Sequence, residues 1–105
     1  MILLDTSVLI DALTGGRRSA PALRRAIESG ERIALTTLVL YEWQRGSRRA
    51  DELAAQEAQG REIDLAIAAC AIRWNATLWT LHVRDFRDVP GLTCLRRDSL
   101  ARGLC

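Results

Sequence analysis

Short apolar runs alternate with helix-like segments along the chain, and this alternation restricts the possible folds more than any other feature. Runs of strand character stand at residues 2–4, 32–36, 77–80 and 92–95, and segments with helical spacing lie between them. Strands that alternate with helices form βα units, which build a parallel sheet with helices against its faces. The pattern therefore predicts an α/β protein. A chain of 105 residues has the length of one domain, spanning 1–105.

The helices are predicted from cap residues and from the spacing of apolar side chains. Three helices are expected to follow polar caps, which are Thr6 or Ser7, Ser19, and Thr37. Two further helices are predicted at 50–58, from composition, and at 62–74, from apolar residues at steps of three and four. The segment 82–88 is expected to be a loop, and the tail from Arg96 onward a polar surface extension.

Composition excludes several classes of protein. The apolar fraction of 49% and the charged fraction of 27% are typical of a soluble globular domain. The three cysteines are widely spaced and form no CxxC pair, which argues against a disulfide framework and a zinc knuckle and favours a reducing compartment. Because Asp5 and Asp11 interrupt the opening apolar run, it is neither a signal peptide nor a membrane span, and we expect a cytoplasmic protein without a membrane partner.

Four acids lie at or near the carboxyl ends of the predicted strands, namely Asp5, Glu42, Asp64 and Asp85. In open parallel sheets these strand ends share one edge, and ligands bind there. Carboxylates gathered at one edge repel one another unless protons or cations neutralise them, and their hard oxygens suit Mg²⁺ or Mn²⁺. Singly, each acid has a structural explanation, because Asp5 can cap a helix and Asp64 can complement a helix dipole. Their shared location indicates a site. His82, the single histidine, is more simply a loop residue than a general base.

Four stretches together resemble a PIN-domain ribonuclease of the VapC toxin type: ILLDTSVLID, TTLVLYEWQRG, REIDLAIAACA and TLWTLHVRDFRDVPGL. They cover most of the chain in the order of the family. The resemblance implies a PIN-like three-layer α/β/α sandwich and an Mg²⁺- or Mn²⁺-dependent endoribonuclease that hydrolyses RNA phosphodiester bonds. It also implies a VapB-type protein antitoxin that blocks the site within a type II toxin–antitoxin module. Apolar residues on the early helices favour a homodimer.

The resemblance carries the family's four catalytic and metal-binding acids onto Asp5, Glu42, Asp64 and Asp85. Asp5 and Asp64 are then the first metal ligands. Glu42 and Asp85 are further ligands that orient water or a second ion. Hydroxyls that support the metal shell or the substrate would be those of Thr6 or Ser7, and Thr80. Arginines that hold the RNA backbone would be Arg45, Arg84 and Arg87.

The chain departs from the family pattern at two points. His82 stands where family members often carry Asn or another small polar residue. The interval from Glu42 to Asp64 is short, because members normally place an extra helical arm there. Either the chain is a deletion variant, or a family-like segment between about 58 and 60 is missing, which the family-like flanks favour. The short interval leaves one alternative function, a catalytically weak or inactive PIN-like binding module that docks a partner or metal without turnover.

Overall fold

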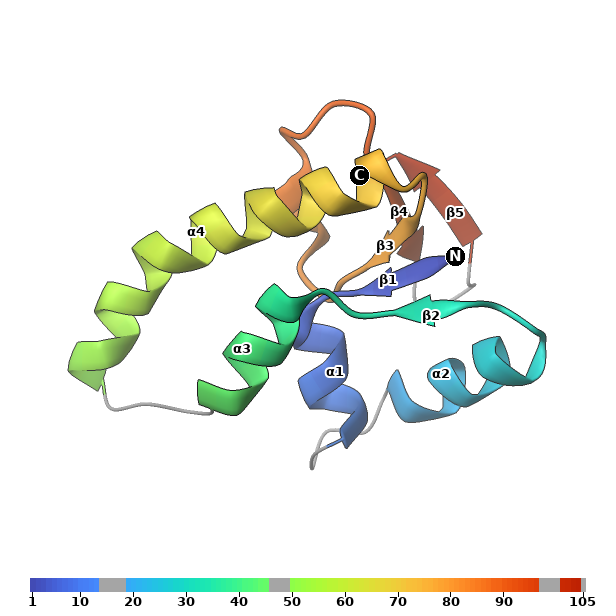
Figure 1. The fold of residues 1–105 in the computed structure, drawn as a ribbon, viewed down its shortest axis with the longest axis horizontal. Helices are drawn as coiled ribbons and strands as arrows, with labels where there is room; N and C mark the ends of the chain where they lie inside the picture. Colours follow the sequence, from blue (N-terminus) through green and yellow to red (C-terminus); the bar gives the residue numbers. More distant parts are fainter. Residues whose placement is uncertain (14–18, 46–49, 97–100, 105) are drawn as a thin grey trace.

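The computed structural model describes residues 1–13, 19–45, 50–96 and 101–104, which form a five-stranded sheet with helices against both faces (Figure 1). The strands are β1 (Ile2–Leu4), β2 (Ile33–Ala34), β3 (Thr77–Trp79), β4 (Thr93–Arg96) and β5 (Ala101–Leu104). Their order in the sheet is β2-β1-β3-β4-β5. The first four strands pair in parallel, whereas β5 runs antiparallel to β4. The prediction of an α/β protein with a mainly parallel sheet is confirmed, although β2 is shorter than the predicted 32–36.

The helices make the two outer layers of the fold. They are α1 (Thr6–Leu13), α2 (Ser19–Glu28), α3 (Thr37–Arg45) and α4 (Ala50–Arg73), with a 3₁₀ turn η1 (Val83–Phe86) inside the predicted loop. In Figure 1, α4 lies over one face of the sheet, and α1 and α2 lie on the other side. This arrangement is the expected three-layer α/β/α sandwich.

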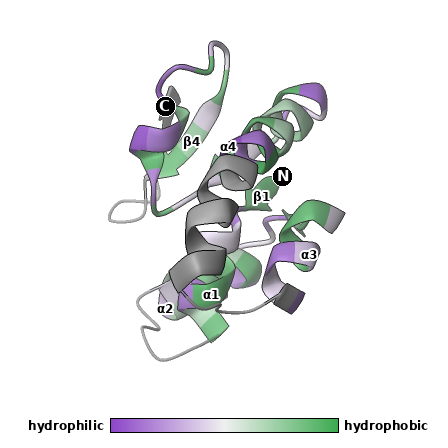
Figure 2. Ribbon diagram, turned by 90° about the vertical axis from the view of Figure 1, so that its left-hand side faces the viewer, coloured by the Kyte–Doolittle hydropathy of each residue, from purple (hydrophilic) through white to green (hydrophobic). Residues whose placement is uncertain are grey.

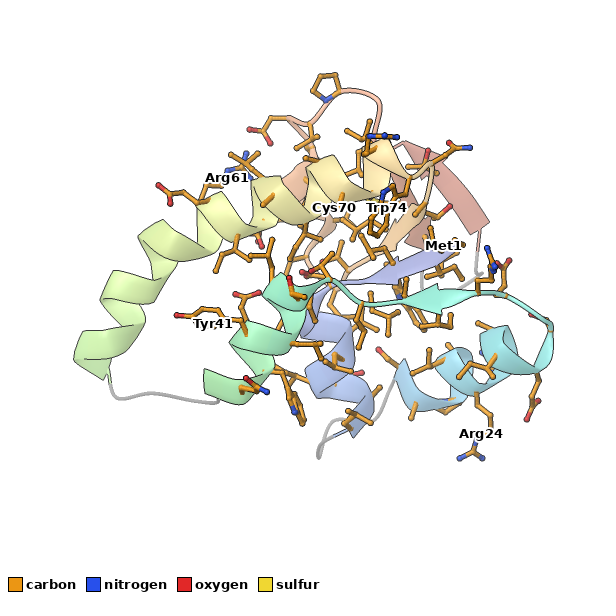
Figure 3. The ribbon with its side chains drawn as sticks, viewed as in Figure 1. Met1, Arg24, Tyr41, Arg61, Cys70 and Trp74 are labelled. Atoms are coloured by element: carbon orange, nitrogen blue, oxygen red, sulfur yellow. The ribbon has the colours of Figure 1, made fainter. Side chains whose placement is uncertain are left out.

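Alternate residues of the central strands supply two separate cores, because successive strand side chains point to opposite faces. Leu3 and Leu78 pack in the core that includes α4 and α3 residues, and both are fully buried. Leu4 and Trp79 pack in the core that includes α1 and α2 residues. Because helices cover both faces, β1 is apolar and buried at all of its positions, which explains its continuous apolar run. The side chains that fill the two layers of packing are drawn in Figure 3.

The caps of α1 and α3 lie one residue before the predicted caps. The N–H of Val39 donates to the hydroxyl of Thr36 at 3.1 Å, so the cap of α3 is Thr36 and not Thr37. The N–H of Leu9 donates to the carbonyl of Asp5 at 3.2 Å, which places Asp5 at the cap position of α1. The expected caps Thr6 and Ser7 are therefore inside the helix, with their hydroxyls free for other contacts. The helix α2 begins at Ser19, the residue predicted to cap it.

A single helix, α4, replaces the two helices predicted at 50–58 and 62–74. It has 24 residues and runs through Gly60. A glycine inside a helix costs only about 1 kcal/mol relative to alanine, which the surrounding helix formers tolerate. The residues 58–60 thus lie within α4, and the absence of a family-like arm remains a prediction. Hydrophilic and hydrophobic residues both occur along α3 and α4 (Figure 2), as in helices with one face against a core.

The C-terminal tail was expected to be a surface extension, and this prediction is wrong for residues 101–104. They form β5, in a register that pairs Cys94 with Gly103. Without β5 the strand β4 would be an edge with unpaired backbone groups, and pairing with them requires no apolar pattern in the sequence.

Cys94 takes part in a disulfide bond, whereas Cys70 is free. The spacing argued against a disulfide framework, which one bonded cysteine does not make, but spacing alone did not predict the bond at Cys94. No helix in the described part of the chain is long and apolar enough to cross a membrane.

Candidate carboxylate site

Asp5 stands at the carboxyl end of β1, where two hydroxyl groups bind its side chain. Its N–H donates to the carbonyl of Trp79 at 2.9 Å, which continues the pairing of β1 with β3. The side chain is almost fully buried, with 5% of the residue exposed. Its Oδ2 accepts hydrogen bonds from Ser7 Oγ at 2.9 Å and from Thr80 Oγ1 at 2.8 Å. A buried carboxylate without partners would be strongly unfavourable, so these hydroxyls both permit and orient it.

The same two hydroxyls tie the segment after β3 to the start of α1. Ser7 Oγ accepts from the N–H of Leu81 at 3.1 Å, and Thr80 Oγ1 accepts from the N–H of His82 at 3.0 Å. Each hydroxyl therefore donates to Asp5 and accepts from the backbone at once. His82 enters this network through its backbone, and the residue is exposed.

Glu42 is held from a second element by the remaining hydroxyl of the opening motif. Thr6 Oγ1, in the first turn of α1, donates to Glu42 Oε1 in α3 at 2.6 Å. The sequence left open whether Thr6 or Ser7 supports the acids. In the structure both hydroxyls bind an acid, because Ser7 donates to Asp5 and Thr6 donates to Glu42. Two consecutive hydroxyl residues on a helix point in different directions, so both contacts are possible.

Asp64 lies in α4 and carries the largest electrostatic perturbation of the site. The pKa of its half-buried carboxyl is raised from 3.8 to about 6, and burial is the largest cause. The negative charges of three other carboxylates contribute to this rise, in the order Asp5, Glu42 and Asp85. Arg61 lowers it. Like charges raise a pKa in this way only from nearby. The acid that follows β1 and the acids in α3 and η1 therefore lie near Asp64 in α4.

The donor atoms of this site fit a hard divalent cation. No three side chains among the histidines, cysteines and acids in the described ranges lie close enough to enclose a metal ion as they stand. The oxygens are nevertheless the ligand type that Mg²⁺ and Mn²⁺ prefer. Burial and the repulsion from neighbouring acids raise the pKa of Asp64, and Arg61 only partly compensates for them. A cation bound among these carboxylates would remove that repulsion.

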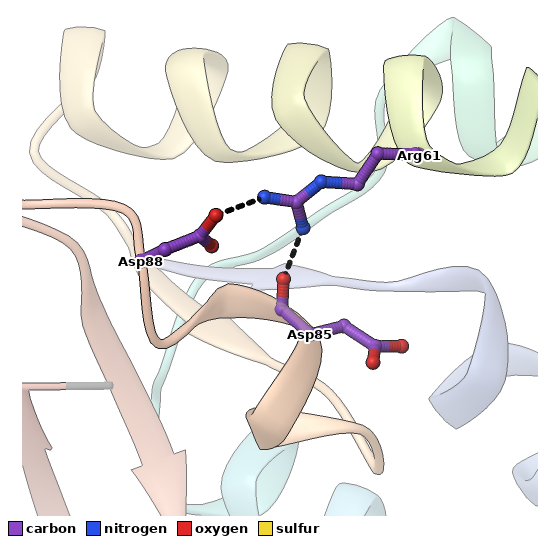
Figure 4. A network of polar contacts seen from close by, with 3 residues as sticks. All are labelled: Arg61, Asp85 and Asp88. Carbon is purple, nitrogen blue, oxygen red and sulfur yellow. Dashed lines mark hydrogen bonds and ion pairs between the residues drawn. The ribbon is translucent and has the colours of Figure 1, made fainter. Parts of the chain in front are cut away.

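An arginine that sequence reasoning did not single out connects α4 with η1. Arg61 Nη2 pairs with Asp88 Oδ2 at 2.6 Å, and Arg61 Nη1 donates to the backbone carbonyl of Asp85 (Figure 4). The hydrogen bond from Arg61 lowers the pKa of Asp88, and the same bond raises the pKa of Arg61. The sequence signal was the position of Arg61 three residues before Asp64, about one helical turn away.

Comparison with known proteins identifies the family. The PIN-domain family model matches residues 2–63, which include Asp5 and Glu42 and end one residue before Asp64. The chain belongs to the PIN-domain family, and the resemblance of its motifs is confirmed. It is similar to Ribonuclease VapC19 of Mycobacterium tuberculosis, in both strain CDC 1551 / Oshkosh and strain ATCC 25618 / H37Rv. Each relative is 34% identical over 104 residues, which cover 99% of this chain and 71% of the relative. No solved structure matches the chain significantly.

Proposed function

We propose that this protein is a metal-dependent endoribonuclease and the toxin of a type II toxin–antitoxin module. The observation that carries the proposal is the half-buried carboxyl of Asp64, whose pKa of about 6 reflects burial and three surrounding acids. Without a cation such an arrangement is unfavourable, and it is typical of a site that operates with one. Membership of the PIN family and the ribonuclease name of the relatives support the same activity. Residues 1–105 would act as one PIN domain.

The four acids have separate tasks in this proposal. Asp5 and Asp64 hold the metal, and Glu42 and Asp85 complete the site as further ligands that orient water. When bound, Mg²⁺ or Mn²⁺ makes a coordinated water more acidic and stabilises the charge that develops on the leaving oxygen during hydrolysis of the RNA phosphodiester bond. The chain's own contribution is orientation. Ser7 and Thr80 fix the direction of the Asp5 carboxylate through Oδ2, and Thr6 fixes Glu42.

The raised pKa of Asp64 sets the pH range of the activity. At about pH 7 a carboxyl with a pKa of about 6 is roughly 90% ionised, so a cation meets little competition from protons. Below about pH 6 the proton competes directly for the same oxygens. We therefore expect cleavage to decline as the pH falls below about 6.

The RNA and a second copy of the chain would occupy different faces. Arg84 and Arg87 are exposed in and beside η1, where they can hold the RNA backbone; the side chain of Arg45 lies outside the described residues. A VapB-type antitoxin would block the acidic site and keep the cytoplasmic protein inactive.

A second copy would cover the surface of α1 and α2, where Leu13 and Ile27 line a cavity of about 530 Å³. These two side chains are 59% and 56% exposed, which is costly for large apolar groups that remain in water.

Cleavage of a structured RNA pool by the pure protein, free of antitoxin, tests the activity. We expect fragments with Mg²⁺ or Mn²⁺ and none with EDTA. Asp5→Asn keeps the size of the side chain and should abolish cleavage, whereas Glu28→Gln removes an exposed carboxylate on α2 and should leave it unchanged. Intact RNA with every metal, from folded protein, would reject the enzyme and leave a binding module. Equal activity of Asp5→Asn and the unaltered protein would reject the assigned site.

A further inference from the structure

Arg61 binds two different groups in and after η1, each with a different nitrogen of its guanidinium. Its Nη2 pairs with the carboxylate of Asp88, and its Nη1 donates to the main-chain carbonyl of Asp85. Figure 4 shows that the Asp85 carboxylate extends away from this guanidinium. The arginine thus binds the backbone of Asp85 and leaves the Asp85 carboxylate free for other ligands.

The two contacts fix η1 against α4. Arg61 belongs to α4, and Asp85 and Asp88 belong to the 3₁₀ turn and the residues after it. Within that segment the described amide hydrogen bonds are local. The N–H of Asp85 donates to the His82 carbonyl at 2.9 Å, that of Arg87 to Arg84 at 3.4 Å, and that of Val89 to Phe86 at 3.2 Å. Phe86 anchors the turn in the core, with 1% of the residue exposed. The polar side of the turn, which carries Asp85, is attached to α4 through Arg61.

We propose that Arg61 is a positioning residue: it holds η1 against α4 and so sets the place of the Asp85 carboxylate opposite Asp64. The first part of this proposal, that Arg61 holds η1 against α4, is argued from the contacts alone. The second part, that this placement of Asp85 supports cleavage, rests on the proposed nuclease function. Arg61 stands one helical turn before Asp64 on the same helix, so the arginine defines the separation between two acids from different elements. A rigid separation matters because small displacements of catalytic groups reduce rates strongly.

Arginine is suited to this role and lysine is not. The planar guanidinium directs two N–H groups along fixed lines, so one side chain can bind a carboxylate and a carbonyl simultaneously. An ammonium group supplies the same charge from a single nitrogen. The substitution Arg61→Lys therefore separates the effect of geometry from the effect of charge.

Amide hydrogen exchange of the metal-free protein tests the structural part without any enzymatic assay. In Arg61→Ala we expect the amides of Asp85 and Val89 to exchange about five- to tenfold faster, since an exposed ion pair and one hydrogen bond are lost. Arg61→Lys should resemble Arg61→Ala. Arg73→Ala, which removes an exposed arginine from the last turn of the same helix, should leave these amides unchanged. The Asp5 amide, bound to Trp79 in the sheet, is the internal reference and should not respond.

Kinetics with RNA tests the catalytic part. We expect Arg61→Ala and Arg61→Lys to lower kcat about three- to tenfold with KM for RNA within about twofold, since the misplaced group acts on the reaction and not on binding. Asp88→Ala should lower kcat less, and the double variant should resemble Arg61→Ala, because both substitutions break the same connection.

The outcomes separate the two proposals. Unchanged exchange at Asp85 and Val89 in Arg61→Ala would overturn the positioning role, whatever the activity. Faster exchange with unchanged kcat would overturn its catalytic consequence. An unaltered protein that cleaves no RNA would reject the proposed function, whereas the exchange measurements would still decide whether Arg61 holds η1.

Discussion

The substitution Asp64→Asn should stabilise the metal-free protein at neutral pH, and the gain should depend on pH. The pKa of Asp64 is raised in the folded state, so between pH 3.8 and about 6 the folded protein binds a proton more tightly than the unfolded chain. The free energy of unfolding therefore falls as the pH rises through this window. Below it Asp64 is neutral in both states, and above it the full repulsion is present. Asparagine is neutral throughout and escapes the effect.

The size of the effect follows from the pKa. A change in the pKa from 3.8 to about 6 corresponds to about 3 kcal/mol for a group that is fully buried away from solvent. Because the carboxyl is only half-buried, solvent screens the repulsion, and about 1–2 kcal/mol is the expected contribution. This is a measurable fraction of the stability of a small domain, which is about 5–15 kcal/mol.

Urea denaturation in EDTA at about pH 4 and about pH 7.5 measures the effect. The stability of Asp64→Asn minus that of the unaltered protein should increase by about 1–2 kcal/mol between the two pH values. Glu62→Gln, which removes an exposed acid from the same helix, controls for the general loss of negative charge. Mg²⁺ or Mn²⁺ should then stabilise the unaltered protein more than Asp64→Asn, because the ion binds only the folded state. An equal difference at both pH values would refute the raised pKa of Asp64 in the folded state.

Three further substitutions test the site and the fold. Thr80→Ala removes a donor to buried Asp5 and should lower cleavage about tenfold and stability by about 1–2 kcal/mol, whereas Thr80→Ser should retain both. Leu78→Ala, in the middle of β3, should lower the free energy of unfolding by about 2–5 kcal/mol in urea titrations, since it empties a fully buried site. Thr36→Ala should cost about 1 kcal/mol in the same assay and Thr37→Ala clearly less, because Thr36 alone caps α3; the reverse order would restore Thr37 as the cap.

The sequence determined the class of fold and the identity of the candidate acids. Alternating strand and helix patterns predicted the parallel sheet, because covering both faces of a sheet demands continuous apolar runs such as residues 2–4. The rule that ligands bind beyond parallel strand ends selected all four acids, and the resemblance to the family gave the same four. Their proposed roles as metal ligands and catalytic groups are still predictions.

The tertiary structure alone decided the contacts between distant segments. Local sequence patterns do not show which strand edge remains unpaired, so β5 was not predicted, and neither was the disulfide bond at Cys94. Hydroxyl partners, too, depend on three-dimensional approach: Ser7 reaches Asp5 and Thr80 across the sheet edge, and Thr6 reaches Glu42 in another helix. The pairing of Arg61 with the η1 segment spans 24 residues to the carbonyl of Asp85. Composition and periodicity describe what each segment buries, whereas hydrogen bonds and charge repulsion depend on distances that exist only once the chain has folded.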